Sequence, residues 1–368
     1  PVQYARHLWN HKVKPYFQRH KYQRRTVKTV LTLLVLVVFI ATIFRPVSSN
    51  MITKGGVSFS TKYARELGVD WEDAYVATLR DLDVNYLRLM SYWDEHEKTK
   101  DKYNFDELDK QFQLAEDYGA KVSLAVGLRQ PRWPECHFPD WIDQDNRDKW
   151  LPELMEYIEV VVNRYKSHPA LESYQLENEA LNHWFGGCNV HDRKLIRERM
   201  IDEFELIKSL DPDHPIVISL SDQHGLPLGE PTPDIYGYSV YRVVYNSQIL
   251  EGYFVYPTPV WYHRLRAWII DLFDNRKILI HELQMEPWGP EPTVNLPIEE
   301  QDKSMGILQM YKNLDFARKI GVDQAYLWGA EWWYWRMTEL NDPGPFNAAK
   351  DMFQQMNSGQ VLIIPENI

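Results

Sequence analysis

The sequence lacks the signatures of several common enzyme classes. No G-x-G-x-x-G opens a helix after the first expected strand, which weakens a dinucleotide-binding fold. G-x-S-x-G does not occur, so serine hydrolase chemistry has no support. His281-Glu282 begins an H-E-x-x-H pattern, but Met285 occupies its last position, and the 12 histidines show no other metal spacing. We therefore expect neither a metal nor a cofactor.

Acidic residues are missing from residues 1–50, which carry nine of the 41 basic residues and none of the 52 acidic ones. The rest of the chain is consequently strongly acidic. An acidic body repels the phosphate backbone, so we expect no nucleic-acid partner.

Charge is also absent from an apolar run between Lys28 and Arg45. Its length is just enough to span a bilayer if both flanking cations snorkel. The basic excess precedes the run, which places the N-terminus in the cytoplasm and the acidic body outside, extracellular or periplasmic. A cleaved signal peptide is the alternative, but the basic region is long for one and no clear cleavage site follows. A buried core helix is disfavoured because every face is apolar. We expect a single-pass signal anchor at 29–45 that contacts the lipid bilayer of the cell membrane.

Beyond Ile52, short β-like runs alternate with amphipathic helical stretches, which is typical of parallel α/β architecture. Eight such units over about 300 residues predict a (β/α)8 TIM barrel rather than a doubly wound sheet. The connection at 221–234 is rich in Gly and Pro and should lack a full helix. The expected strands are 56–60, 85–90, 121–127, 173–176, 216–220, 235–241, 277–280 and 324–328. Helical patterns such as 105–118, 150–165, 192–210, 260–273 and 299–320 lie between these strands.

The only two cysteines, Cys136 and Cys188, follow the third and fourth expected strands. These strands are neighbours in a barrel, so a disulfide can form. Two free thiols are the other interpretation, and both stay open.

Two glutamates, Glu179 and Glu282, each end a strand-like run about a hundred residues apart. The carboxyl ends of barrel strands meet on one face, which would bring both side chains together. Here the sequence resembles clan A of the retaining glycoside hydrolases, which includes cellulases, β-mannanases, β-xylosidases and β-galactosidases. Those barrels end strand four with Asn-Glu, as Asn178-Glu179 does here, and strand seven with a second Glu. The resemblance covers roughly residues 52–355.

The resemblance implies a role for each glutamate. Glu179 would be the general acid/base and Glu282 the nucleophile. The two carboxyl groups lie ~5–5.5 Å apart in retaining enzymes and ~6.5–9.5 Å apart in inverting ones. Asn178 would hydrogen-bond the sugar 2-hydroxyl. Arg88 matches the second-strand arginine that pairs with the nucleophile, although an arginine in an apolar strand needs a carboxylate partner in any case.

Two further assignments follow from the resemblance, and two other glutamates are candidates outside it. Tyr241 would hydrogen-bond the nucleophile, with Tyr238 as the competing choice. Trp328 would form the floor of the −1 sugar subsite, although a core tryptophan is the other interpretation. Beyond the seventh strand Glu286 is a second candidate nucleophile, and Glu331 after the eighth strand is a weaker one.

Aromatic residues make up 14% of the chain, with 14 Trp and 22 Tyr. Such a surplus can fill a large core or supply flat platforms for sugar rings. Many tryptophans fall in loops after the expected strands, and we expect about half of them to line sugar subsites. Trp93, Trp288 and Trp332 are the chosen substrate-binding candidates. The remaining tryptophans in these loops are Trp133, Trp141, Trp184, Trp333 and Trp335.

The sequence thus predicts a basic cytoplasmic tail (1–28), an anchor (29–45), a linker (46–54) and a barrel (55–368) that hydrolyses a β-linked polysaccharide or oligosaccharide without a cofactor. A transglycosylase that uses the same two glutamates is an alternative within the enzyme class. A catalytically silent, membrane-tethered glycan-binding barrel is the alternative outside it, although such a protein would need only the aromatic residues.

Overall fold

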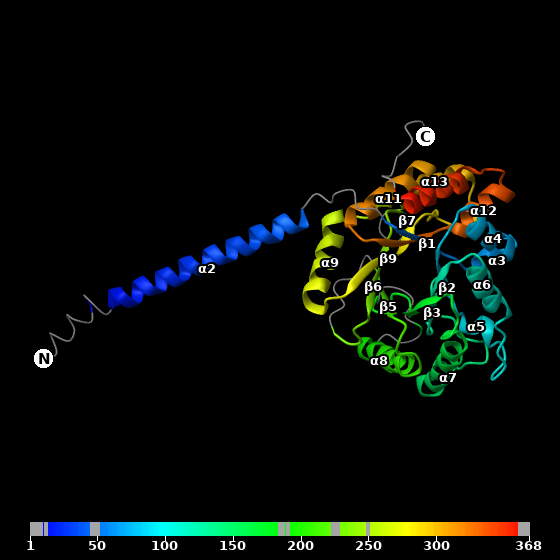
Figure 1. Cartoon of the computed structure of the whole chain (residues 1–368), viewed down its shortest axis with the longest axis horizontal. Coiled ribbons are helices and arrows are strands. Elements are labelled where there is room, and N and C mark those ends of the chain that lie inside the picture. The colour runs from blue at the N-terminus through cyan, green and yellow to red at the C-terminus, as the bar shows by residue number, and fades with distance from the viewer. Residues whose placement is uncertain are drawn as a thin grey trace. The chain divides into compact units, whose positions relative to one another are not determined.

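A computed structural model of the chain describes residue 10 and residues 14–44, 52–182, 188, 192–221, 229–247 and 251–359. The chain divides into two compact units, Pro1–Ser48 and Ser49–Ile368. Figure 1 shows the whole chain, coloured from the N-terminus to the C-terminus.

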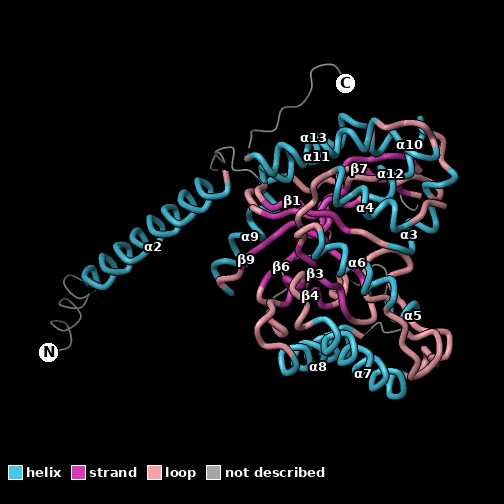
Figure 2. Tube along the Cα trace, turned by 45° about the vertical axis from the view of Figure 1, so that its right-hand side comes forward, coloured by secondary structure: helices cyan, strands magenta, loops and turns pink. Residues whose placement is uncertain are grey.

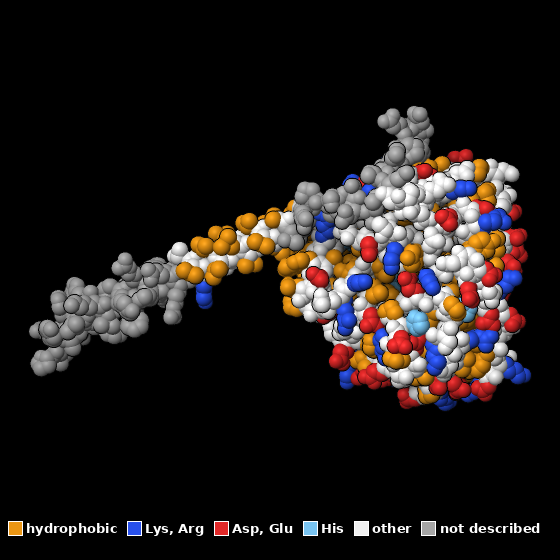
Figure 3. Space-filling model, in the orientation of Figure 1, with side chains coloured by type: hydrophobic (Ala, Val, Ile, Leu, Met, Phe, Trp, Pro, Cys, Tyr) orange, Lys and Arg blue, Asp and Glu red, His pale blue; other side chains and the backbone are white. Residues whose placement is uncertain are grey.

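The first unit contains one long helix, α2 (Lys14–Ile43). Hydrophobic side chains from Val27 to Ile40 are largely exposed along it, as Figure 3 shows. In the portion of the chain that the structure describes, no helix combines the length and apolar character needed to cross a membrane. The transmembrane helix that we expected at 29–45 is therefore not supported by the fold.

The second unit is a closed barrel of eight parallel strands in the order β1-β10-β9-β6-β5-β4-β3-β2. The first strand pairs with β10 on one side and β2 on the other, which closes the ring. The predicted (β/α)8 barrel is thus confirmed. The strands are β1 (Lys54–Ser58), β2 (Tyr86–Met90), β3 (Lys121–Val126), β4 (Leu171–Leu176), β5 (Ile216–Leu220), β6 (Ile235–Val240), β9 (Lys277–Gln284) and β10 (Gln324–Trp328).

Helices surround this ring of strands (Figure 2). Their apolar faces pack on the strands and form one large core. Met90, Tyr92, Ala125 and Trp328 form a separate small cluster. The helices are α3 (Thr61–Leu67), α4 (Trp71–Asp81), α5 (Trp93–His96), α6 (Asp106–Asp117), α7 (Arg147–Tyr165), α8 (Arg193–Leu210), α9 (Val260–Asp274), α10 (Ile298–Met305), α11 (Ile307–Ile320), α12 (Ala330–Glu339) and α13 (Gly344–Ser358), with a short 3-10 helix η2 (Thr293–Asn295).

Three features differ from the expected elements. Strand β9 runs to Gln284, four residues beyond the predicted end, so Glu282 lies within the strand. The helix expected at 299–320 is interrupted at Gly306, which caps α11 in an extended conformation. An antiparallel hairpin, β7 (Val243–Asn246) with β8 (Gly252–Val255), follows β6 and was not anticipated. The helix-poor connection predicted at 221–234 lies partly outside the described residues and stays a prediction.

Candidate active site

A cavity of about 530 Å³ opens where the strands end at their carboxyl termini, and Glu179 and Glu282 both line it. Glu179 follows β4, Tyr241 follows β6 and Trp328 ends β10. The cavity therefore occupies the face on which barrel enzymes place their active sites. Its other lining residues are Tyr63, Glu66, Arg132, Trp133, Glu135, Asn178, Ser221, Val244, Tyr256, Glu286, Pro287, Trp288, Gly289, Glu291, Pro292 and Thr293.

Two donors fix both oxygens of the Glu282 carboxylate. Arg88 Nη1 donates to Oε1 at 2.8 Å, and the Tyr241 hydroxyl donates to Oε2 at 2.9 Å. Charge-assisted hydrogen bonds such as these two are roughly twice as strong as neutral ones. They hold Glu282 in one orientation with its charge compensated. Tyr238, the competing tyrosine, does not contact Glu282 in this way; its ring centroid lies 4.5 Å from Arg266 Cζ.

A bulge in β9 turns Glu282 toward the cavity. Tyr238 pairs with Ile280 and the next β6 residue, Ser239, pairs with Glu282, so His281 is an extra residue in β9. Bulges of this type re-aim side chains next to functional sites. The imidazole of His281 fits only because residue 237 of β6 is a glycine: a Cβ at Gly237 would lie 2.8 Å from His281 Nδ1.

Glu179 sits in a different environment from Glu282. Burial and the nearby charge of Glu282 raise its pKa to about 7, and the hydroxyl of Ser239, which donates to its Oε1, acts in the opposite direction. Its backbone N–H donates to Ser219 Oγ at 2.8 Å, and its φ of 45° is unusual for a non-glycine residue. A carboxyl group with this pKa keeps a large protonated fraction near pH 7 and can donate a proton.

Asn178 is held by the same network. Its Oδ1 accepts from Arg88 Nη2 at 2.8 Å and from Gln175 Nε2 at 3.2 Å. Gln175 Oε1 in turn accepts from Arg88 Nε at 2.5 Å. With its oxygen occupied in this way, the amide presents Nδ2 toward the cavity.

The two other candidate nucleophiles, Glu286 and Glu331, share one cation. Arg132 donates to both oxygens of Glu286, and its Nη2 lies 3.2 Å from Glu331 Oε2. Burial raises the pKa of Glu286 to about 7, against the opposing effect of Arg132. Trp328 Nε1 also donates to Glu286 at 2.7 Å, and the Arg132 guanidinium lies 4.1 Å from the Trp328 ring centroid. Glu286 therefore orients Trp328 and Arg132.

The tryptophans divide into two groups. Trp288 and Trp133 line the cavity with 51% and 76% of their surface exposed. Trp93 and Trp332 are fully buried, do not line the cavity and donate to Glu97 and Gln301 respectively. They belong to the packing of helices α5 and α12, so we assign them no part in the site. Trp141, Trp333 and Trp335 also lie away from the cavity lining, and Trp184 falls outside the described residues.

The two cysteines form a disulfide, with Cα atoms 5.4 Å apart. It links the segment after β3 to the segment after β4, and Glu135 next to Cys136 lines the cavity. Sequence reasoning missed Glu135 and Arg132, since neither lies at a strand end. Their position near Cys136, in the loop that follows β3, is the signal that could have found them.

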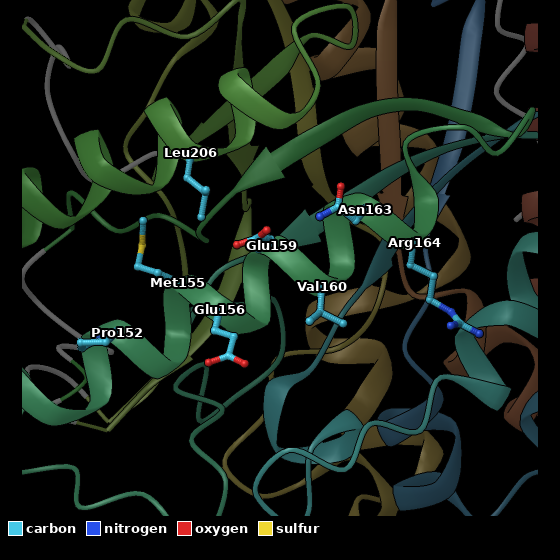
Figure 4. A pocket seen from close by; sticks show the side chains of 8 residues that line it. All are labelled: Pro152, Met155, Glu156, Glu159, Val160, Asn163, Arg164 and Leu206. Atoms are coloured by element: carbon cyan, nitrogen blue, oxygen red, sulfur yellow. The ribbon is translucent and has the colours of Figure 1, made fainter.

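A second hollow lies on the outer surface of the barrel, between α7 and α8 (Figure 4). Glu156, Glu159 and Arg164 of α7 line it together with Leu206 of α8, and Arg164 lies farther along α7 in this view. It contains none of the residues of the strand-end cavity and has the open form of a groove between neighbouring helices.

Comparisons with known proteins agree with this architecture. A protein-family model described as beta-galactosidase matches residues 69–211. Beta-galactosidase BgaB from Geobacillus sp. (strain Y412MC61) is 25% identical over 156 residues, which cover 36% of this chain and 23% of BgaB. Beta-galactosidase LacZ from Heyndrickxia coagulans is 25% identical over 132 residues, 31% of this chain and 19% of LacZ. The matched stretch is thus less than a quarter of each relative.

Solved structures share the barrel over most of its length. A GH5_18 protein from Streptomyces cattleya in complex with GlcNAc has a TM-score of 0.53 at 12% identity, over 83% of this chain and 80% of that one. A beta-galactosidase from the Antarctic haloarchaeon Halorubrum lacusprofundi has a TM-score of 0.51 at 15% identity, over 82% and 58%. These likenesses show the fold. Together the comparisons show a barrel of the type found in glycosidases, with local sequence similarity to beta-galactosidases at 69–211.

Proposed function

We propose that this protein is a retaining glycoside hydrolase that cleaves a β-linked glycan by double displacement. One observation carries the proposal: a carboxylate held by Arg88 and Tyr241 shares a cavity with Glu179, whose pKa burial and the charge of Glu282 raise to about 7. Paired carboxyl groups in unlike environments are the arrangement that acid–base glycosidases use.

In the first step Glu282 attacks the anomeric carbon and Glu179 gives its proton to the departing glycosidic oxygen. The C–O bond of the glycoside breaks, and an ester bond between sugar and Glu282 forms. Esterification removes the charge of Glu282, which is one of the two main causes of the raised pKa of Glu179. Glu179 then becomes the stronger acid, and its carboxylate is ready to act as a base.

In the second step Glu179 takes a proton from water, whose oxygen attacks the anomeric carbon. The ester bond breaks, Glu282 regains its charge and Glu179 is protonated again. Neither step needs a cofactor. If a sugar hydroxyl replaces water, the same site performs transglycosylation.

The substrate is proposed to be a neutral polysaccharide or oligosaccharide. Asn178 and Trp328 would contact the sugar at the cleavage point, while Trp288 and Trp133 offer exposed rings for neighbouring units. The local similarity to beta-galactosidases makes β-galactosides the first substrates to test. The acidic character of the chain beyond residue 50 supports a partner other than nucleic acid.

We further propose that residues 29–45 tether the barrel to the cell membrane, with the catalytic domain outside the cytoplasm. The support is the uncharged apolar sequence and the exposed apolar side chains of α2. Expression of the full chain in cells followed by carbonate extraction tests this. Retention in the membrane fraction is expected, and complete release would contradict it.

Hydrolysis of a panel of aryl β-glycosides and β-glucans by the full chain tests the catalytic proposal. Glu179→Gln and Glu282→Gln should each lose turnover, the former by about 10²–10⁴-fold because general acid–base catalysis is removed. The matched control is Glu107→Gln, because Glu107 is exposed and pairs with Arg65 on the helical exterior. Full turnover in either active-site variant would contradict the proposal, and glycan binding by a wild type without turnover would favour a glycan-binding protein.

A further inference from the structure

Glu135, a third carboxyl group of the cavity, has no part in the double displacement described above. It lies in the connection between β3 and α7, with 12% of its side chain exposed. Its Oε2 accepts from Arg129 Nε at 2.6 Å, and its Oε1 accepts from Asn178 Nδ2 at 3.3 Å. Glu135 is thus in contact with the residue that immediately precedes the proposed acid/base.

The backbone around Glu135 is fixed at two points. The neighbouring Cys136 is bonded to Cys188, which holds the segment to the chain after β4. Nearer β3, the Glu177 carboxylate accepts from the backbone N–H groups of Leu128 and Arg129, at 2.8 and 3.0 Å. Gly127 permits this contact, because a Cβ there would lie 2.6 Å from Glu177 Oε1. A side chain held on so constrained a segment has a defined position in the cavity.

The amide of Asn178 complements the carboxyl group beside it. Arg88 and Gln175 occupy Asn178 Oδ1, which leaves Nδ2 as the group that faces the cavity. One of its two N–H bonds is directed at Glu135, and the other can serve a ligand. A hydroxyl group both donates and accepts, so it matches an amide N–H next to a carboxyl oxygen.

We propose that Glu135 is a specificity-determining residue that, with Asn178, selects substrates with a free hydroxyl at C2 of the sugar being cleaved. Asn178 donates to the hydroxyl oxygen, and the hydroxyl hydrogen is donated to Glu135. A 2-deoxy sugar leaves both groups without a partner, and a 2-acetamido group replaces the small donor with a bulky one. This inference rests on the proposed function, which brings the sugar to Asn178, and on the resemblance to clan A hydrolases, which implies that Asn178 contacts the 2-hydroxyl.

The electrostatic setting is compatible with this role. Burial raises the pKa of Glu135 to about 8; the charge of Arg129 opposes this, and the charges of Glu179 and Glu282 add to it. At neutral pH the group is therefore mostly protonated, so it adds little negative charge beside Glu179. It still has a carbonyl oxygen that accepts a hydrogen bond.

Binding measured without turnover tests the inference. Titration calorimetry of the full chain with Glu179→Gln compares a methyl β-glycoside with its 2-deoxy counterpart. The parent should prefer the 2-hydroxy sugar, and Glu135→Ala should reduce this preference by about 2- to 10-fold, the effect of losing one hydrogen bond between uncharged groups. Glu135→Gln keeps a carbonyl acceptor and should restore most of the preference. Cys136→Ser with Cys188→Ser should weaken it in the same direction, because Glu135 loses its anchor.

The matched control is Glu107→Ala, which should leave both dissociation constants unchanged. An undiminished preference in Glu135→Ala would overturn the inference, as would equal weakening for both sugars, which indicates a purely structural role. Failure of both sugars to bind would overturn it as well. Turnover by the wild-type chain is a separate readout, so failure of the proposed hydrolysis is distinguished from failure of C2 selection.

Discussion

Arg88 and Glu282 form an ion pair inside the mouth of the barrel, with Nη1 and Oε1 2.8 Å apart and side chains 0% and 5% exposed. They come from β2 and β9, 194 residues apart in sequence. Because both charges have left water, neither is tolerated without the other. The pair therefore links the stability of the barrel to the orientation of its proposed nucleophile.

Arg88→Met should destabilise the barrel by about 3–5 kcal/mol, the cost of leaving a buried charge unpaired. Urea unfolding measures this. The double variant Arg88→Met with Glu282→Gln should recover part of the loss, because it removes the orphaned carboxylate. A double variant that is less stable than Arg88→Met alone would show that the pair is not the source of the effect.

Activity should fall at alkaline pH as Glu179, with its pKa raised to about 7, loses its proton. The hydroxyl of Ser239 donates to Glu179 and lowers this pKa, since it stabilises the charged form. Ser239→Ala should therefore move the alkaline limb of the kcat/KM profile to higher pH. A limb that stays in place or moves to lower pH would argue against Glu179 as the acid.

Stability should also depend on pH. Burial raises the pKa of Glu135 to about 8 and those of Glu179 and Glu286 to about 7, from an ordinary value of 4.5. A carboxyl group whose folded pKa is raised contributes fully below pH 4.5, and its contribution is lost as pH rises through the folded pKa. The urea midpoint should fall between pH 5 and 9, and less steeply in Glu135→Gln. A midpoint that rises over this range would contradict the assignment.

Two tryptophan variants distinguish a ring that lines the proposed sugar subsites from a ring that packs in the core. Trp93→Ala removes a fully buried ring and should cost about 3–5 kcal/mol of stability. Trp288→Ala removes a half-exposed ring from the cavity edge and should raise KM for oligosaccharides with little change in the urea midpoint. The opposite pattern, an unstable Trp288→Ala and a stable Trp93→Ala with raised KM, would contradict the placement of the two rings.

The sequence predicted the barrel well because its strands alternate regularly with amphipathic helices, and 216–220 and 324–328 match β5 and β10 residue for residue. The carboxylates of the proposed mechanism could be found because Glu179 follows β4 and Glu282 lies near the carboxyl end of β9, although within the strand rather than beyond it. The bulge at His281 could not, since register depends on pairing with β6 and β10, far away in sequence. Nor could the burial of Trp93 and Trp332, which is set by the faces that their helices turn toward the core.

Glu135 illustrates the same limit at the site itself. Its contact with Asn178 depends on the path of a loop, and that path is set by the disulfide and by the hydrogen bonds of Glu177. Local sequence carries none of these long-range constraints. Charge state likewise follows from three-dimensional neighbours, so the different roles of Glu179 and Glu282 rested on resemblance until their environments were visible.

Glu282 is proposed to be the nucleophile of a covalent mechanism. Incubating the full chain with 2-deoxy-2-fluoro aryl β-glycosides, whose fluorine slows release of the intermediate, should add the mass of one fluorosugar to the intact protein. Peptide mapping should place the adduct on Glu282, and Glu282→Gln should remain unlabelled. Turnover of ordinary glycosides with no adduct, or an adduct on Glu286, would contradict the account.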